Sequence, residues 1–111
     1  MEFDTDIAII GGGLNGPVLA LALASSGLQV TLIDTLEVKI RRNAGFDGRS
    51  YALALSSARM LEALGLWQGI ADQAQPMLEI KVTDGRAGEA PSPMFMHFDH
   101  AEIEEGPMGY M

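Results

Sequence analysis

Residues 7–34 read IAIIGGGLNGPVLALALASSGLQVTLID, and this stretch decides the fold. A short apolar run precedes a glycine-rich turn, an Ala/Leu-rich segment follows the turn, and a second apolar run ends at Asp34. Continuous apolar runs are typical of parallel strands, which are covered on both faces. We therefore predict a strand over 6–10, a helix over 14–26 and a second strand over 28–33, which together form a βαβ unit.

The glycine spacing in the turn predicts a ligand. Gly11, Gly13 and Gly16 form the pattern GxGxxG, which with an acidic residue after the second strand is typical of a βαβ unit that binds the ADP half of a dinucleotide. In this pattern, Gly11 permits the tight turn, Gly13 lets the backbone approach a pyrophosphate, and Gly16 lets the helix lie close to the strand. Gly27 is expected to end the helix in a left-handed conformation.

The start of the predicted helix and the end of the second strand complete this interpretation. Unpaired N–H groups of a helix that begins near Leu14 would point at the phosphates. Asp34 would accept hydrogen bonds from the ribose and repel a 2′-phosphate, so FAD or NAD fits better than NADP. The alternative is a turn that serves packing alone. The predicted cofactor-binding residues are Gly11, Gly13, Leu14, Asn15, Gly16 and Asp34.

Composition narrows the functional classes. The 111 residues are 48% hydrophobic and carry a formal net charge of −8, which argues against nucleic acid and against anionic membrane surfaces as partners. The absence of cysteine excludes disulfides, thiolate catalysis and cysteine-ligated metals. The acidic N-terminus lacks the basic region of a signal peptide, and no apolar run is long enough to cross a bilayer. We therefore expect a soluble, cytoplasmic protein.

The remainder of the chain shows weaker patterns. Residues 35–48 are expected to form a long connection without regular structure. Helical periodicity predicts a helix from Ser50 to Leu64, ended by Gly65, and a short helix over 69–75. Alternation predicts a strand over 78–84, and residues 94–98 after a Gly- and Pro-rich turn are expected to form the returning strand of a hairpin. The acidic tail that follows is not expected to close a fold. Because two parallel strands are only the first piece of a doubly wound sheet, we expect the chain to be the front portion of a larger protein.

Two stretches together carry a family resemblance. DTDIAIIGGGLNGPVLALALASSGLQVTLID (4–34) and DGRSYALALSSARMLEALGLW (47–67) resemble the FAD-dependent aromatic hydroxylases, in particular the ubiquinone-biosynthesis hydroxylases related to para-hydroxybenzoate hydroxylase. The first stretch is shared by many flavoproteins. The second, with RSYAL (49–53) and LGLW (64–67), is more specific to this branch. Residues 78–98 and the closing GYM also resemble the start of that family's substrate domain.

The resemblance implies an α/β fold and an enzyme. It implies a Rossmann-like, partial FAD-binding domain over 1–76, with an incomplete doubly wound parallel sheet, and the start of a substrate domain over 77–111. FAD would be bound by the residues given above, and Arg49 matches a family arginine that reaches the cofactor. The implied parent hydroxylates an aromatic small molecule, a ubiquinone precursor, with O2 and with NAD(P)H as reductant. Two further motifs of the family lie outside these 111 residues, so the resemblance implies an N-terminal fragment that is inactive alone.

Some questions stay open at this point. No catalytic residue is assigned within the chain. Alternatives are another FAD- or NAD-dependent oxidoreductase and a non-catalytic nucleotide-binding module. The implied parent could also associate peripherally with a membrane or a biosynthetic complex.

Three side-chain groups have competing interpretations. A histidine and acidic group could hold a metal, but a solvated strand end is favoured and no metal is predicted; its members are His97, Asp99, His100 and Glu102. The basic group of Lys39, Arg41 and Arg42 could bind a 2′-phosphate, but a solvated loop is favoured because of Asp34. Methionines near the C-terminus would form an adaptable contact surface or lack core partners, which favours self-association; they are Met94, Met96, Met108 and Met111.

Overall fold

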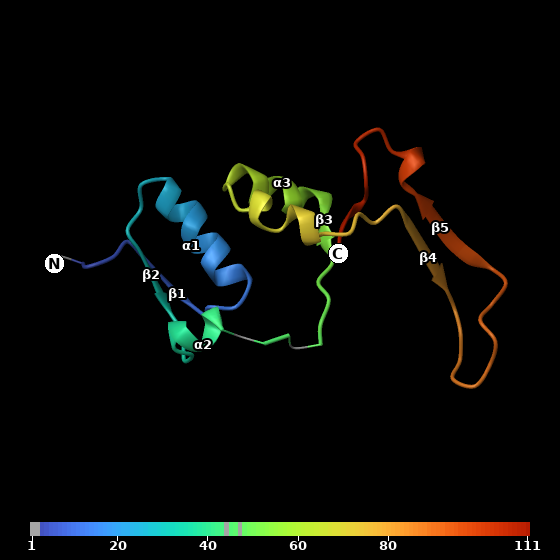
Figure 1. Ribbon diagram of the computed structural model, residues 1–111, viewed down its shortest axis with the longest axis horizontal. Coiled ribbons are helices and arrows are strands. Elements are labelled where there is room, and N and C mark those ends of the chain that lie inside the picture. Colours follow the sequence, from blue (N-terminus) through green and yellow to red (C-terminus); the bar gives the residue numbers. More distant parts are fainter. Residues whose placement is uncertain (1–2, 44, 47) are drawn as a thin grey trace. The chain divides into compact units, whose positions relative to one another are not determined.

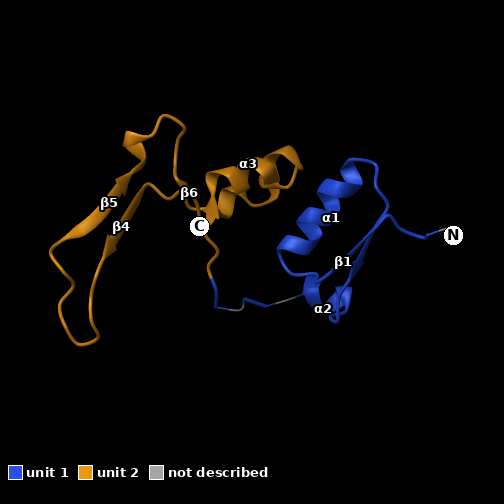
Figure 2. Cartoon of the chain, turned by 180° about the vertical axis from the view of Figure 1, so that it is seen from behind, with its two compact units in different colours: residues 1–49 blue, residues 50–111 orange. Residues whose placement is uncertain are grey.

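The computed structural model describes residues 3–43, 45–46 and 48–111. The chain divides into two compact units, residues 1–49 and residues 50–111 (Figure 2). Part of the acidic N-terminus (Met1 and Glu2), and Ala44 and Asp47 of the 35–48 connection, lie outside the described residues.

The first unit is built on a βαβ element, as the sequence predicts. Strand β1 (Ile7–Ile10) pairs in parallel with β2 (Val30–Ile33), and helix α1 (Asn15–Ser25) crosses between them and contacts both strands (Figure 1). The register runs from Ile7 opposite Val30 to Ile10 opposite Ile33. Parallel strands need such a crossover because the chain must return to the starting edge before the second strand begins. A tight turn would make the two strands antiparallel.

Gly27 ends α1 as expected. Its φ is +90°, in the left-handed region that glycine adopts without a side-chain clash. Its N–H donates to the carbonyl of Ala24 at 2.9 Å, and the N–H of Leu28 donates to that of Leu23 at 3.3 Å. These bonds satisfy carbonyls at the end of the helix and turn the chain into β2.

The connection after β2 contains a helical turn that sequence patterning did not predict. Helix α2 (Val38–Arg42) follows Glu37, whose carbonyl accepts the N–H groups of Ile40 and Arg41 at 3.0 and 3.2 Å. The last turn of α2 is basic, which suits the negative end of the helix dipole. The expectation of a connection without regular structure was therefore wrong at α2, because five residues are too few to show a period.

The second unit contains a pairing between its two ends. Strand β3 (Leu53–Ala54) pairs antiparallel with β6 (Gly109–Tyr110), and helix α3 (Leu55–Ala63) follows β3 directly and packs against both. The helix expected from Ser50 thus begins at Leu55, because the residues before it pair with the C-terminal strand. The acidic tail was expected not to close a fold, yet its last residues do so within this unit.

Two 3₁₀ turns replace the short helix expected over 69–75. They are η1 (Trp67–Gly69) and η2 (Ala71–Gln73). Gly65 precedes them with φ +73°, as expected for the residue that ends α3. The Trp67 ring lies 4.7 Å from the Tyr110 ring, which ties this segment to β6.

The predicted hairpin is confirmed. Strand β4 (Glu79–Thr83) pairs antiparallel with β5 (Phe95–Asp99), and the 3₁₀ turn η3 (His100–Glu102) follows (Figure 1). Because side chains alternate between the faces of a strand, one face of the hairpin is apolar and the other is largely polar. The apolar face comprises Ile80, Val82, Met96 and Phe98.

The described part of the chain has no helix long and apolar enough to cross a membrane.

Candidate functional site

The turn after β1 uses a glycine where the backbone requires one. Gly11 has φ +111°, which side-chain-bearing residues rarely adopt, and its N–H donates to the carbonyl of Ile33 at 2.8 Å. The turn therefore lies at the carboxyl ends of both β1 and β2. In parallel α/β units this edge is where ligands bind.

Gly16 allows the first turn of α1 to lie against the glycine turn. A Cβ atom at Gly16 would lie 1.8 Å from the carbonyl oxygen of Gly11 and 3.3 Å from Cδ1 of Leu32. Both contacts come from the βαβ unit itself, and the closer one is with backbone. Glycine at this position is thus required by helix–strand packing, as the glycine pattern predicts.

Gly13 has a different environment. Its φ is not in the left-handed region, and a Cβ at this residue would meet no atom of the described chain within 4 Å. Neither backbone conformation nor packing therefore demands glycine here. A backbone left bare beside open space is what close approach of a ligand requires.

An open pocket of about 460 Å³ lies at this turn. Its walls come from the end of β1, the glycine turn and the first turns of α1; the lining residues are Ile9, Ile10, Gly11, Gly13, Leu14, Asn15, Gly16 and Leu19. Five of the predicted cofactor-binding residues are among them. Among the described residues, no side chain forms a capping hydrogen bond at the start of α1, and the first turn of this helix carries no acidic residue. The N–H groups of this turn can therefore receive an anion.

Asp34 follows β2 and turns its carboxylate back to the glycine turn. One carboxylate oxygen, Oδ2, accepts the N–H of Gly12, and Oδ1 accepts the N–H of Leu36 at 2.6 Å. The Leu36 N–H and the Gly12 N–H lower the pKa of Asp34, burial opposes them, and the charge of Arg41 adds a smaller lowering effect. Asp34 is therefore ionised at neutral pH, and its remaining lone pairs can accept ribose hydroxyls.

Arg41 is a residue of this site that sequence reasoning missed. Its NH1 group donates to the carbonyl of Gly12 and its NH2 group to that of Leu36, both at 3.1 Å. NH1 also lies 3.9 Å from Oδ2 of Asp34. We expected Arg41 to be solvated together with Lys39 and Arg42. No local pattern distinguishes these three cations, and only the turn of α2 brings Arg41 to Gly12.

Arg49 lies exposed at the end of the first unit. It is not among the residues that line the pocket at the glycine turn. Its expected contact with the cofactor remains a prediction.

The polar face of the hairpin gathers a histidine and two carboxylates. Ligand atoms of Glu79, His97 and Asp99 lie within 4.8 Å of one another. Lys81 Nζ, however, lies 3.0 Å from Glu79 Oε2 and lowers the pKa of that carboxyl. This group differs from the candidate metal ligands in the sequence, because it contains Glu79 in place of His100 and Glu102. An ammonium group already pairs with one carboxylate, so the arrangement is that of a solvated charged face.

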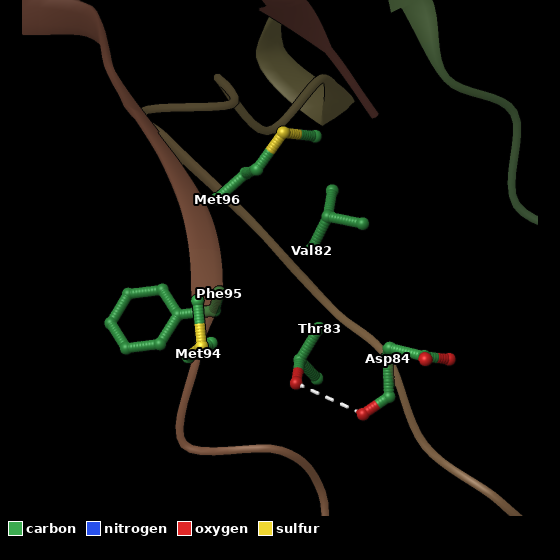
Figure 3. Close-up of a pocket in the computed structure, with 6 residues that line it drawn as sticks. All are labelled: Val82, Thr83, Asp84, Met94, Phe95 and Met96. Atoms are coloured by element: carbon green, nitrogen blue, oxygen red, sulfur yellow. Dashed lines mark hydrogen bonds between the residues drawn. The ribbon is translucent and has the colours of Figure 1, made fainter.

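A second open pocket, of about 480 Å³, lies on the hairpin. Figure 3 shows its lining residues, Val82, Thr83, Asp84, Met94, Phe95 and Met96. The walls are mostly apolar, and Asp84 is their one charged residue. A dinucleotide needs donors for its phosphates. The one side-chain donor among these lining residues, the Thr83 hydroxyl, already donates to backbone carbonyls, whereas the glycine turn provides N–H groups at the start of α1. We therefore place the candidate site at the glycine turn.

Residues 4–104 match the sequence profile of the FAD binding domain family. The match includes the glycine turn, Asp34 and the hairpin. The chain belongs to the FAD-binding domain family. FAD is accordingly its cofactor, which agrees with the preference that Asp34 indicated in the sequence.

Several curated relatives are ubiquinone hydroxylases. The chain is 45% identical over 106 residues to ubiquinone hydroxylase UbiL of Rhodospirillum rubrum, covering 96% of this chain and 23% of the relative. It is 36% identical over 88 residues to ubiquinone hydroxylase UbiM of Neisseria meningitidis, covering 78% and 19%. It is 32% identical over 109 residues to 3-demethoxyubiquinol 3-hydroxylase of Escherichia coli, covering 96% and 26%. The chain thus spans about a quarter or less of the length of these relatives.

Proposed function

We propose that this chain provides the ADP-binding part of the FAD site in a flavin monooxygenase that hydroxylates an aromatic ring, with a ubiquinone precursor as substrate. The cofactor class rests on family membership, and the reaction class on similarity to ubiquinone hydroxylases. NAD(P)H is the proposed reductant of the whole enzyme.

The observation that carries the proposal is the bare backbone at Gly13. Packing explains Gly16 and backbone conformation explains Gly11, whereas nothing in the described chain requires glycine at position 13. Gly13 also borders the pocket at the uncapped start of α1. Close approach of a pyrophosphate to the backbone accounts for both facts.

The residues of the first unit would divide the binding of the ADP half among them. Gly13, Leu14, Asn15 and Gly16 would surround the pyrophosphate at the start of α1, and Asp34 would accept the adenosine ribose hydroxyls. Arg49 would reach the cofactor from the end of this unit. When bound, FAD would supply the redox chemistry that activates O2 for hydroxyl transfer to the ring.

The proposal extends to domain organisation. The parallel pair β1–β2 would be the first part of a doubly wound sheet, in a partial FAD-binding domain over residues 1–76. Residues 77–111, with the hairpin, would begin the substrate domain. The exposure of Ile10 and Ile33, at 86% and 50%, supports further layers over this pair, because parallel sheets are normally covered on both faces.

Substitution of Gly13 by alanine tests the site directly. The added methyl group meets no atom of the described chain, so the fold should persist while the pyrophosphate loses its close approach. We expect the affinity of the chain for ADP to fall about tenfold or more, which corresponds to one or two charge-assisted hydrogen bonds. Calorimetric titration with ADP and FAD measures the change.

Gly69→Ala is the matched control. Gly69, like Gly13, has a φ outside the left-handed region, and a Cβ at this residue would meet no atom of the described chain within 4 Å. Gly69 belongs to the second unit, away from the proposed site in the sequence. Gly69→Ala should leave ADP binding unchanged. Equal affinity of wild type and Gly13→Ala for ADP would contradict the proposed site.

A further inference from the structure

We propose that Arg41 is a positioning residue of the adenosine end of this site, which holds the Asp34 carboxylate where the ribose needs it. The inference rests on the proposed function, since the ribose is the ligand that Asp34 would receive. It concerns a residue outside both the glycine pattern and the lining of the pocket.

The hydrogen bonds around Asp34 form a closed arrangement. Gly12 and Leu36 each donate a backbone N–H to the Asp34 carboxylate. The same two residues each accept a hydrogen bond from the Arg41 guanidinium through their carbonyls. Arg41 therefore fixes both peptide segments that bind the carboxylate. Its planar fork of donors suits two carbonyls at once, which a lysine ammonium on a flexible stem cannot match.

Burial and packing support the same role. The Arg41 side chain is 29% exposed and that of Asp34 is 14% exposed, although both follow β2 in a polar connection. Gly12 is itself buried, and a Cβ at this position would lie 1.6 Å from NH1 of Arg41. The absence of a side chain at Gly12 thus makes room for the guanidinium. The same Cβ would lie 2.8 Å from Oδ2 of Asp34, so Gly12→Ala should displace Arg41 and also disturb the Asp34 carboxylate, without changing either charged residue.

The order imposed on Asp34 has a consequence for binding. A carboxylate that is held by two N–H groups before the ligand arrives loses less freedom when a ribose hydroxyl donates to it. Without Arg41, the Gly12 and Leu36 segments are joined only through the Asp34 carboxylate itself, and part of that order must be created on binding. The loss should affect adenosine and ADP equally, because the phosphates take no part in it.

The test uses the whole 111-residue chain and the variants Arg41→Gln, Arg41→Lys and Gly12→Ala. In the absence of ligand, the carboxyl titration of Asp34 is followed by carbon NMR. We expect its pKa to rise in Arg41→Gln and Gly12→Ala. Titrations with adenosine and with ADP should both show affinity reduced about three- to tenfold, as for loss of one or two hydrogen bonds. Arg41→Lys, which keeps the charge but not the fork, should fail to restore affinity.

Two controls accompany these measurements. Arg42→Gln changes the exposed neighbouring arginine and should leave both the Asp34 titration and the affinities unchanged. In an Asp34→Asn background, Arg41→Gln should cause little further loss, because a residue that acts through Asp34 has no effect once Asp34 is changed. Should Arg41→Gln not fold, Arg41→Lys, which leaves Gly12 and Asp34 in place, carries the same comparison.

The possible results separate the two proposals. An unchanged Asp34 titration in both Arg41→Gln and Gly12→Ala would overturn the positioning role, whatever the chain binds. A loss of ADP affinity with full adenosine affinity would also overturn it, since Arg41 would then contact phosphate. If the wild-type chain binds neither ligand while the Asp34 titration moves as expected, the positioning of Asp34 stands and the proposed function of the site fails.

Discussion

Replacement of Gly16 by alanine should destabilise the first unit, although the same change inside a helix is normally favourable. Gly16 lies in the first turn of α1, where alanine would gain about 0.5–1 kcal/mol from helix propensity. Its Cβ, however, would lie 1.8 Å from the Gly11 carbonyl oxygen, far inside any van der Waals contact.

The clash decides the sign of the effect. The atom that Cβ meets is backbone and forms part of the turn into α1, so relief requires α1 to move away from β1 and β2. Overpacking of this kind costs about 1–3 kcal/mol. After the gain in propensity is subtracted, we expect the free energy of unfolding of the first unit to fall by about 1–2 kcal/mol.

Urea unfolding followed by the amide NMR signals of β1 and β2 measures this change. Trp67 fluorescence follows the second unit in the same samples. Gly13→Ala is the matched control, three residues away, where the new methyl group meets no atom of the described chain and stability should change by less than about 0.5 kcal/mol. A Gly16→Ala chain with an unchanged or higher midpoint would refute the packing argument.

Two further predictions concern pH and the second unit. The pKa of Asp34 is lower in the folded chain than its ordinary value of 3.8, so its stabilisation is complete above that value and is lost as the pH falls through the folded pKa. Asp34→Asn should therefore weaken the loss of stability of the first unit as the pH falls below about 4. Acid unfolding followed by the β1 and β2 amide signals measures this, and the same pH dependence as wild type would contradict it. Tyr110→Ala should destabilise the second unit by about 2 kcal/mol, because it removes the ring packed on Trp67 and weakens β6. Trp67 fluorescence during urea unfolding measures this, and a midpoint equal to that of wild type would show that the contact contributes little.

Part of the candidate site could be predicted because it depends on neighbours in sequence. The roles of Gly11 and Gly16 follow from a turn and a helix that begin within a few residues of each other. The hairpin of β4 and β5 was likewise visible, as alternation in the first strand followed by a Gly- and Pro-rich turn and a second apolar segment. Arg41 could not be found in this way, since α2 is too short for a period and three cations lie close together within it.

Sequence by itself determined the βαβ unit, its ligand class and the hairpin, because glycine conformation, continuous apolar runs and alternation are properties of short segments. Only the tertiary structure decided which cation reaches Gly12, 29 positions away in the sequence. It also decided that β3 pairs with β6, although more than 50 residues separate the two strands. Two-residue strands carry no detectable pattern. Their partners are selected by the packing of α3 and by the contact of Trp67 with Tyr110, interactions that exist only once the chain has folded.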